Sequence, residues 1–247
     1  MIKKHTSITD KGLKRKVNQD CIFEIVIGDN GIFVVADGMG GHSKGEMASH
    51  YTCDNISKWW ELLDKDLLDT DFEGCINKLK QVVFLINSNL YETYSYQNEV
   101  GGTTLCVLII HQNHGGVVWV GDSRVYMEYK GSFEQITVDD VWENDKELTE
   151  GLTEYMINNS PERGKLTQAV GGEPDVDVHH KIFVVEKKSY FLMCSDGIYK
   201  YLNGSDMEFF FNRIHKMLGI NIIKKMIINR VLESGAGDNY SLILLKL

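Results

Sequence analysis

The stretch Phe33-Val34-Val35-Ala36-Asp37-Gly38 decides the fold of this chain, because it runs an apolar segment into an aspartate beside a glycine. The same pattern recurs at Val117-Val118-Trp119-Val120-Gly121-Asp122 and at Phe191-Leu192-Met193-Cys194-Ser195-Asp196-Gly197. A fourth aspartate, Asp238, stands just before the last apolar run. For any one of them alone a turn is the simpler interpretation, since Asp hydrogen-bonds its own backbone and Gly tolerates positive φ.

The segments around these runs predict an α+β protein. Strand-like residues 21–27 and 32–36 flank Gly28-Asp29-Asn30-Gly31, and Asn-Gly favours a tight hairpin turn, so we expect the chain to open as a hairpin. Helices are predicted from 44 to about 64 and, from apolar residues at steps of three and four, at 72–90. Further strands form an antiparallel meander and then a closing group, with a late helix among them: strands 103–110, 117–120, 125–129, 133–136, 176–185, 190–194 and 240–245, and helix 220–231.

Composition limits the function classes. The 247 residues contain no linker or repeat, so we expect one domain. A net charge of −9 without a basic block opposes nucleic-acid binding. The apolar runs fall far below the ~18 residues of a membrane span, and the start lacks a signal-like apolar region, so we expect a cytoplasmic protein. Five widely spaced cysteines are expected to be reduced and mainly buried.

Strand ends from remote segments can converge at one edge of a sandwich. Converging carboxylates repel one another, and oxygen-only ligation points to Mg²⁺ or Mn²⁺ as the neutralising ion. The carbonyl of Gly38 could approach such an ion closely. Two hard cations sharing a carboxylate activate a bridging water and clamp phosphoryl oxygens, which predicts phosphate hydrolysis. Arg15, upstream of Asp20, could grip the phosphate, although taken alone it is more readily interpreted as a solvated surface residue.

These motifs resemble the metal-dependent type 2C serine/threonine protein phosphatases (PPM family) in their bacterial form. A lone Asp-Gly is a weak signal, but the ordered set is specific and covers nearly the whole chain. Its parts are RKVNQD (15–20), VVADGMGGHSKGEMAS (34–49), GGTT (101–104), VGDSR (120–124), LTQAVGG (166–172), CSDGI (194–198) and GDNY (237–240). The resemblance implies an antiparallel β-sandwich of two sheets flanked by α-helices on both sides (αββα), in one domain, 1–247, with a flap at about 139–164.

The resemblance also implies a site with two Mn²⁺ or Mg²⁺ ions. Asp37 would bridge the two metals and the Gly38 carbonyl would complete one site. Asp196, Asp238 and Asp20 would supply the remaining metal contacts, Asp20 directly or through water. The resemblance places Arg15 on the substrate phosphate and Asp122 in a third, weaker metal site. It implies that the aspartates are supported by hydrogen bonds from Thr103, Thr104, Ser123 and Asn239.

The implied mechanism is direct in-line attack on phosphoserine or phosphothreonine by the hydroxide that bridges the metals. No protein nucleophile is expected, so Cys194 and Ser195 are predicted to be chemically idle. The general acid stays unassigned, because Met39 stands where animal members have a histidine, and His42 is equally well interpreted as structural. His179-His180 is given no role.

Two departures from the family pattern bear on the site. Lys200 replaces an acid common in the family, so we expect the Asp122 metal site to be weak or empty and turnover to need high Mn²⁺; alternatively, Lys200 points outward. The flap has Asp139-Asp140-Val141 where Asp-His-Ser is frequent. Its excess of acids could favour basic phosphopeptides, although a solvated helix face is the preferred interpretation.

Two other functions compete with a protein phosphatase: a non-catalytic member that binds phosphoproteins, and a hydrolase of small phosphate esters. For the phosphatase we expect phosphorylated protein substrates, an opposing serine/threonine kinase, a monomeric state, and no nucleic-acid or membrane partner.

Overall fold

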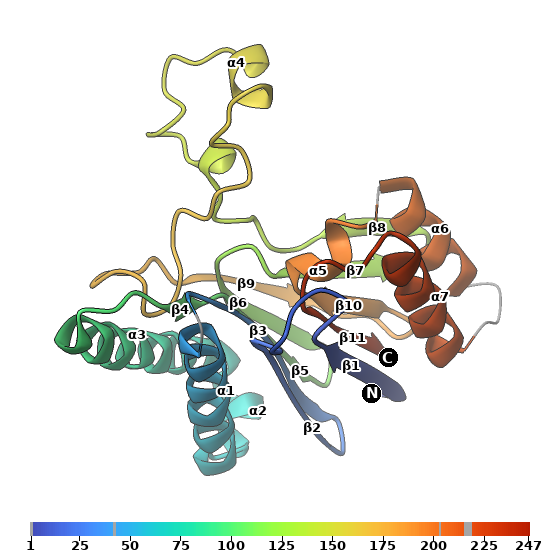
Figure 1. Cartoon of the computed structure of the whole chain (residues 1–247). Helices are drawn as coiled ribbons and strands as arrows, with labels where there is room; N and C mark the ends of the chain where they lie inside the picture. Colours follow the sequence, from blue (N-terminus) through green and yellow to red (C-terminus); the bar gives the residue numbers. More distant parts are fainter. Residues whose placement is uncertain (1, 42, 203, 215–218) are drawn as a thin grey trace.

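Two antiparallel sheets pack face to face in the computed structural model, which describes residues 2–41, 43–202, 204–214 and 219–247 (Figure 1). The first sheet has the order β1 (Lys4–Asp10), β11 (Tyr240–Lys246), β10 (Tyr190–Cys194), β7 (Arg124–Tyr129) and β8 (Ser132–Gln135). The second has the order β2 (Asp20–Ile27), β3 (Asn30–Met39), β5 (Leu105–His111), β6 (His114–Val120) and β9 (His179–Val184), and the short β4 (Gly102–Thr103) pairs with β3.

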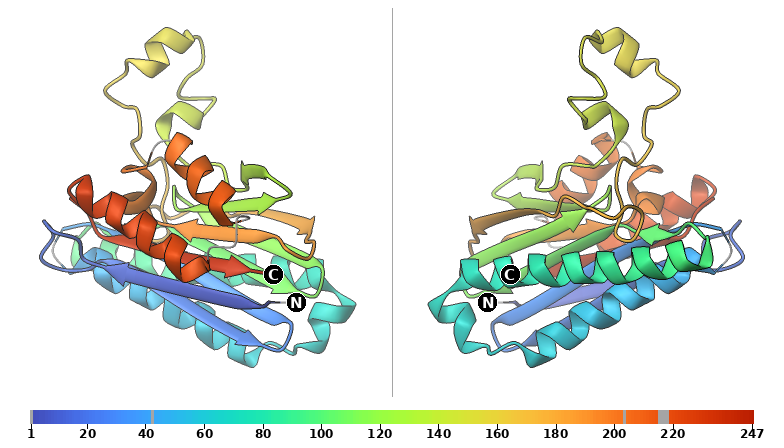
Figure 2. Two further views of the ribbon diagram at one scale, coloured as in Figure 1. Left: turned by 90° about the vertical axis from the view of Figure 1, so that its right-hand side faces the viewer. Right: turned by 90° about the vertical axis from the view of Figure 1, so that its left-hand side faces the viewer.

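Helices cover the outer face of each sheet, so the predicted αββα sandwich is confirmed (Figure 2). Over the second sheet lie α1 (Lys44–Leu62), α2 (Asp66–Thr70) and α3 (Phe72–Gln97). Over the first lie α5 (Asp196–Tyr199), α6 (Gly204–Ile214) and α7 (Ile220–Glu233). Among the described residues, no helix is long and apolar enough to cross a membrane.

Strand β3 shows why the opening stretch is apolar throughout. Phe33 and Val35 point into the core between the sheets, whereas Ile32, Val34 and Ala36 face α1 and α3. All five are fully buried, because the strand is covered on both faces. Burial of each large aliphatic side chain contributes about 1.5–3 kcal/mol, so this strand is a firm base for the aspartate at its end.

Three details of the strand predictions are wrong. The chain does not open as a hairpin, since β1 comes first and pairs with β11. The β2–β3 turn is Gly28-Asp29, with Gly28 at φ 61°, and Asn30 is already paired with Ile27. The predicted meander divides between the sheets, because the chain crosses over between β6 and β7.

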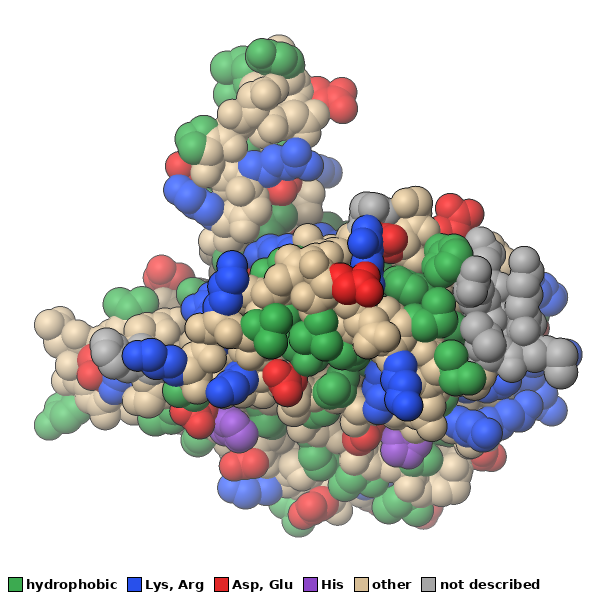
Figure 3. Space-filling view, turned by 45° about the vertical axis from the view of Figure 1, so that its right-hand side comes forward, with side chains coloured by type: hydrophobic (Ala, Val, Ile, Leu, Met, Phe, Trp, Pro, Cys, Tyr) green, Lys and Arg blue, Asp and Glu red, His purple; other side chains and the backbone are tan. Residues whose placement is uncertain are grey.

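Beyond its base at Asp139 and Asp140, the flap (residues 139–164) stands away from the sandwich as a separate column (Figure 1 and Figure 3). It contains the 3₁₀ helix η1 (Trp142–Asn144) and the short helix α4 (Glu154–Asn158). Hydrophobic side chains gather at its outer tip, where Tyr155 and Met156 are exposed. The flap therefore has no long helix, and the interpretation of its acids as a solvated helix face is wrong.

Candidate active site

The remote aspartates meet in a pocket of about 240 Å³, at the edge of the sandwich where β3 and β10 end and β11 begins. Five of the predicted residues line it together with Asp122: Arg15, Asp37, Gly38, Asp196 and Asp238. A larger cavity of about 880 Å³ lies at the other end of the first sheet, among Lys130, Lys246 and other lysines, and contains none of these aspartates.

Asp37 lies near the end of β3, where the neighbouring strand changes from β5 to β4. Its backbone N–H donates to the Thr104 hydroxyl at 3.0 Å, and the Thr104 N–H donates back to the Asp37 carbonyl at 2.8 Å. The Thr104 and Ser123 hydroxyls are 2.7 Å apart. Thr104 and Ser123 therefore support the aspartate loops through hydrogen bonds, in line with the resemblance. Burial raises the pKa of Asp37 well above its usual range, and the negative charges of Asp20 and the other nearby carboxylates add to this effect.

Gly38 lies directly beneath helix α1. A Cβ atom at this position would come within 2.1 Å of the carbonyl oxygen of Gly45 and 2.6 Å of that of Gln19. Only glycine fits between these backbones. The glycine of the first motif thus brings the start of α1 against the pocket, which also leaves the Gly38 backbone on the pocket wall.

Asp20 lies behind the pocket wall, 2% exposed, as the direct pairing partner of Asp37 on β2. Its Oδ2 accepts hydrogen bonds from the hydroxyls of Ser195 at 2.8 Å and Ser241 at 2.7 Å. Its Oδ1 is buried and receives no hydrogen bond from the described residues. Burial raises the pKa of Asp20 to about 6. Ser195 thus has a structural use, and Ser241 is a site residue that the motifs did not reveal.

Asp238 and Arg15 form an ion pair across the pocket mouth, with Nη2 and Oδ2 2.8 Å apart. The loop that carries Arg15 is held by the side chain of Asn239. That amide donates to the carbonyls of Lys11 at 3.0 Å and Val17 at 2.9 Å. It also accepts from the Gln19 N–H at 2.9 Å. One asparagine therefore fixes both ends of the arginine loop.

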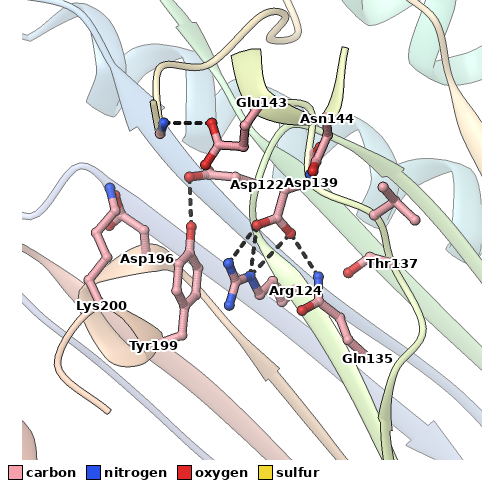
Figure 4. A network of polar contacts seen from close by, with 12 residues as sticks. Asp122, Arg124, Gln135, Thr137, Asp139, Glu143, Asn144, Asp196, Tyr199 and Lys200 are labelled. Atoms are coloured by element: carbon pink, nitrogen blue, oxygen red, sulfur yellow. Dashed lines mark hydrogen bonds and ion pairs between the residues drawn. The ribbon is translucent and has the colours of Figure 1, made fainter. Parts of the chain in front are cut away.

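The helix α5 places two side chains against the other carboxylates of the pocket (Figure 4). The Lys200 ammonium, just past the end of the helix, lies 2.5 Å from Asp196 Oδ2. The Tyr199 hydroxyl donates to Asp122 Oδ2 at 2.7 Å. Lys200 does not point outward as the alternative had it. Tyr199 had no motif signal, and its contact joins residues 77 positions apart.

The base of the flap is anchored by acids that are paired inside the protein. Asp139, 7% exposed, receives three contacts of 2.6–3.1 Å from the Arg124 guanidinium. Asp140 contacts His179 Nε2 at 2.8 Å and accepts from the Gly121 N–H at 2.7 Å. Asp140 thus ties the flap base both to His179 on β9, which was given no role from sequence, and to the loop before Asp122. His42 lies outside the described residues.

The donor set fits hard divalent cations. The carboxylate and carbonyl groups of the pocket offer oxygen ligands, and the buried Asp20 Oδ1 is one more acceptor that no donor of the described residues reaches. Within the described parts of the chain, no three His, Cys, Asp or Glu side chains form a ready cage.

Comparison with known proteins agrees with this geometry. A family model described as protein phosphatase 2C matches residues 13–232. The chain belongs to the protein phosphatase 2C family. It is 27% identical over 203 residues to protein phosphatase PhpP of Streptococcus pneumoniae, covering 81% of each chain. It is 30% identical over 207 residues to serine/threonine phosphatase stp of Listeria monocytogenes, covering 81% of this chain and 79% of that one.

Solved structures of this family share the whole fold. The Mycobacterium tuberculosis serine/threonine phosphatase PstP/Ppp superposes with a TM-score of 0.81 at 25% identity, covering 100% of this chain and 99% of that chain. Stp1 of Staphylococcus aureus gives 0.83 at 26% identity, covering 100% and 95%. A complex of the PstP catalytic domain with two manganese ions shares the fold with a TM-score of 0.76 at 24% identity, covering 98% and 97%.

Proposed function

We propose that this chain is a metal-dependent protein phosphatase that hydrolyses phosphoserine and phosphothreonine in protein substrates. Membership of the protein phosphatase 2C family supports the activity. The observation that carries the proposal is the pocket itself, which brings Arg15, Asp37, Gly38, Asp196 and Asp238 together from segments up to 223 residues apart in the sequence.

In this proposal two Mn²⁺ or Mg²⁺ ions are held by Asp37, the Gly38 carbonyl, Asp196 and Asp238, with Asp20 in support behind the wall. When bound, the ions activate a water molecule and neutralise charge on the phosphoryl group. Asp37 is near enough to Asp20, Asp196 and Asp238 for their charges to raise its pKa, and this central place among the carboxylates suits a shared ligand. No side chain acts as nucleophile, since Ser195 is fully buried and committed to Asp20.

Arg15 binds the substrate phosphate in this scheme. Its guanidinium is half-exposed at the pocket mouth, and among the described residues its ion pair is with Asp238. With Asp238 serving as a metal ligand, the guanidinium would be free to contact the phosphate through two parallel N–H groups. Arg15→Lys keeps the charge but loses this geometry, so KM for a phosphopeptide should rise more than kcat falls.

The finer assignments belong to the same proposal. Residues 1–247 act as one cytoplasmic phosphatase domain with the flap at 139–164. It works as a monomer that opposes a serine/threonine kinase and uses neither nucleic acid nor membrane. Phosphoprotein substrates follow from the family, and the flap beside the pocket is the surface best placed to contact them.

The test is phosphate release from phosphothreonine peptides with and without Mn²⁺. Wild-type protein should release phosphate only with Mn²⁺, and both Asp37→Asn and Asp238→Asn should lose at least a hundredfold in kcat/KM. Asp177→Asn, an exposed acid outside the pocket, is the matched control and should keep full activity. Activity that survives EDTA, or that survives both substitutions, would rule the proposal out, and binding of the peptides without hydrolysis would favour the non-catalytic alternative.

A further inference from the structure

Tyr199 is hydrogen-bonded to Asp122, the carboxylate that the family resemblance assigns to a third metal ion. Its hydroxyl donates to Asp122 Oδ2 at 2.7 Å, and Asp122 is only 3% exposed. The ring of Tyr199 lies beneath Arg124, whose guanidinium carbon is 3.5 Å from the ring centroid. Moving the Tyr199 hydroxyl away from Asp122 would require the ring to move out of its contact with Arg124.

Arg124 is itself immobilised from the opposite side. Asp139 accepts from its Nε and Nη2 groups at 2.6–3.1 Å, and its Nη1 donates to the Tyr126 hydroxyl at 2.9 Å. Figure 4 shows the resulting row of side chains from Asp122 through Tyr199 and Arg124 to Asp139 at the flap base. Asp122 lines the pocket and is at the same time the end of this network of protein side chains.

Lys200 neutralises the neighbouring carboxylate. Its ammonium contacts Asp196 Oδ2 at 2.5 Å. Tyr199 and Lys200 are adjacent in sequence. A single short segment after Asp196 thus delivers a hydroxyl to one carboxylate and a positive charge to the next.

A divalent cation on this side of the pocket would meet both groups. An ammonium has three donors and no lone pair, so it cannot be a ligand, and it repels a cation that shares Asp196. The tyrosine proton blocks one of the two oxygens of Asp122. The residues around Asp122 therefore do not fit the third ion that the resemblance implies. Asp37, Gly38, Asp196 and Asp238 still line the pocket for two ions, because Lys200 contacts only Oδ2 of Asp196 among the described atoms.

We propose that the Tyr199 hydroxyl and the Lys200 ammonium together take the place of a third divalent cation between Asp122 and Asp196. The loaded protein then carries two divalent ions. This inference rests on the proposed function, because it presumes that the pocket holds metal ions, and it concerns how many ions the site accepts.

The test is a count of Mn²⁺ ions per chain, from titration with free Mn²⁺ followed by its electron paramagnetic resonance signal. Wild-type protein should show two binding events up to millimolar Mn²⁺. Tyr199→Phe combined with Lys200→Asp should add a third, at least tenfold tighter than any third event in the wild type. Lys165→Asp is the control, because it reverses the charge of an exposed lysine that pairs with Glu162. This variant should bind two ions.

A third tight ion in the wild-type protein would overturn the inference, and this measurement does not depend on any variant folding. A doubly substituted protein with native circular dichroism and only two ions would overturn it as well. Phosphate release separates the two claims. Two bound ions without phosphate release would rule out the proposed function and leave the inference standing. Phosphate release with three bound ions in the wild type would support the proposed function and overturn the inference.

Discussion

Arg124 and Asp139 form a buried ion pair whose loss should be costly. Asp139 is 7% exposed. In Arg124→Met, the Gln135 amide is the one side-chain donor that the described residues still offer to it. Removing one partner of a buried pair typically costs about 3–5 kcal/mol, because the other charge stays desolvated. Urea unfolding should therefore show a loss of about 3 kcal/mol or more. A loss below about 1 kcal/mol would mean that the flap base relaxes to admit water.

The control for this prediction is another arginine of the same region. Arg163 pairs with Glu143 at 3.5 Å, and its side chain is 54% exposed. Exposed pairs contribute about 0–1 kcal/mol, so Arg163→Met should change unfolding by less than about 1 kcal/mol. The contrast between the two variants isolates burial as the cause.

Sequence reasoning found the aspartates and missed their partners for a single physical reason. An aspartate at the end of an apolar run has a local pattern. The hydroxyl that holds Asp20 comes from Ser241, 221 positions away, and serine is common in strands and loops alike. Tyr199 likewise looks like any aromatic residue of a helix until the fold sets it against Asp122. Long-range pairing has no local signal, so only the structure shows it.

Among the elements, α5 depends on the glycine at its start. A Cβ atom on Gly197 would lie 1.8 Å from the backbone oxygen of Asn239, so the helix could not rest against the start of β11. Gly197→Ala should therefore lower Tm by several degrees and weaken Mn²⁺ binding, because Asp196 and Asp238 move apart. Gly219→Ala is the control, since no atom of the described residues lies within 4 Å of its Cβ position. Equal Tm values for the two variants, measured by thermal unfolding, would contradict this account.

The flap base should respond to pH through His179. The hydrogen bond that the His179 ring donates to Asp140 raises the pKa of His179, against the opposing effect of burial. Asp177 adds to the rise and Lys80 reduces it. A raised histidine pKa means that the folded state binds the proton more tightly. Its stabilisation is full below about pH 6.5 and disappears as the pH rises through the folded value.

His179→Gln should therefore destabilise the protein more at pH 6 than at pH 8.5. The difference should stay below about 1 kcal/mol, since the ring is 31% exposed and solvent screens the pair. Chemical unfolding at the two pH values measures it. His180→Gln is the matched control, because the neighbouring ring forms no ion pair with an acid of the described chain. A larger loss at pH 8.5 would show that neutral His179 is the stabilising form.

Elements were predictable where one face or both faces are apolar. The periodic residues of α3 and the continuous apolar run of β3 are recognisable because burial on one face or on both imposes a pattern on them. Strand β1 was missed because its sequence, KHTSITD, is polar, and its place at the sheet edge leaves it largely exposed. Its position is set by pairing with β11, a partner at the other end of the chain.

At the scale of the whole molecule, closure of the sandwich builds the pocket. β1 and β11 pair along seven residues, from Lys4 with Lys246 to Asp10 with Tyr240. This pairing brings the loop of Arg15 beside Asp238 and lets Asn239 hold it. The site is thus assembled only in the complete fold, which is why its binding of metal should be coupled to global stability.

Metal removal should reveal that coupling. The five acids of the site repel one another in a chain that already carries a net charge of −9, so the metal-free protein is under electrostatic strain. A ligand at 100 times its Kd stabilises the folded state by about 2.7 kcal/mol per site. With about 2–4 °C per kcal/mol for a chain of this size, two sites should raise Tm by roughly 10 °C or more. Thermal unfolding in EDTA and in saturating Mn²⁺ at matched ionic strength measures the shift. The Asp37→Asn, Asp238→Asn double variant should lose most of it, since a shift that persists there would come from acids elsewhere on the surface.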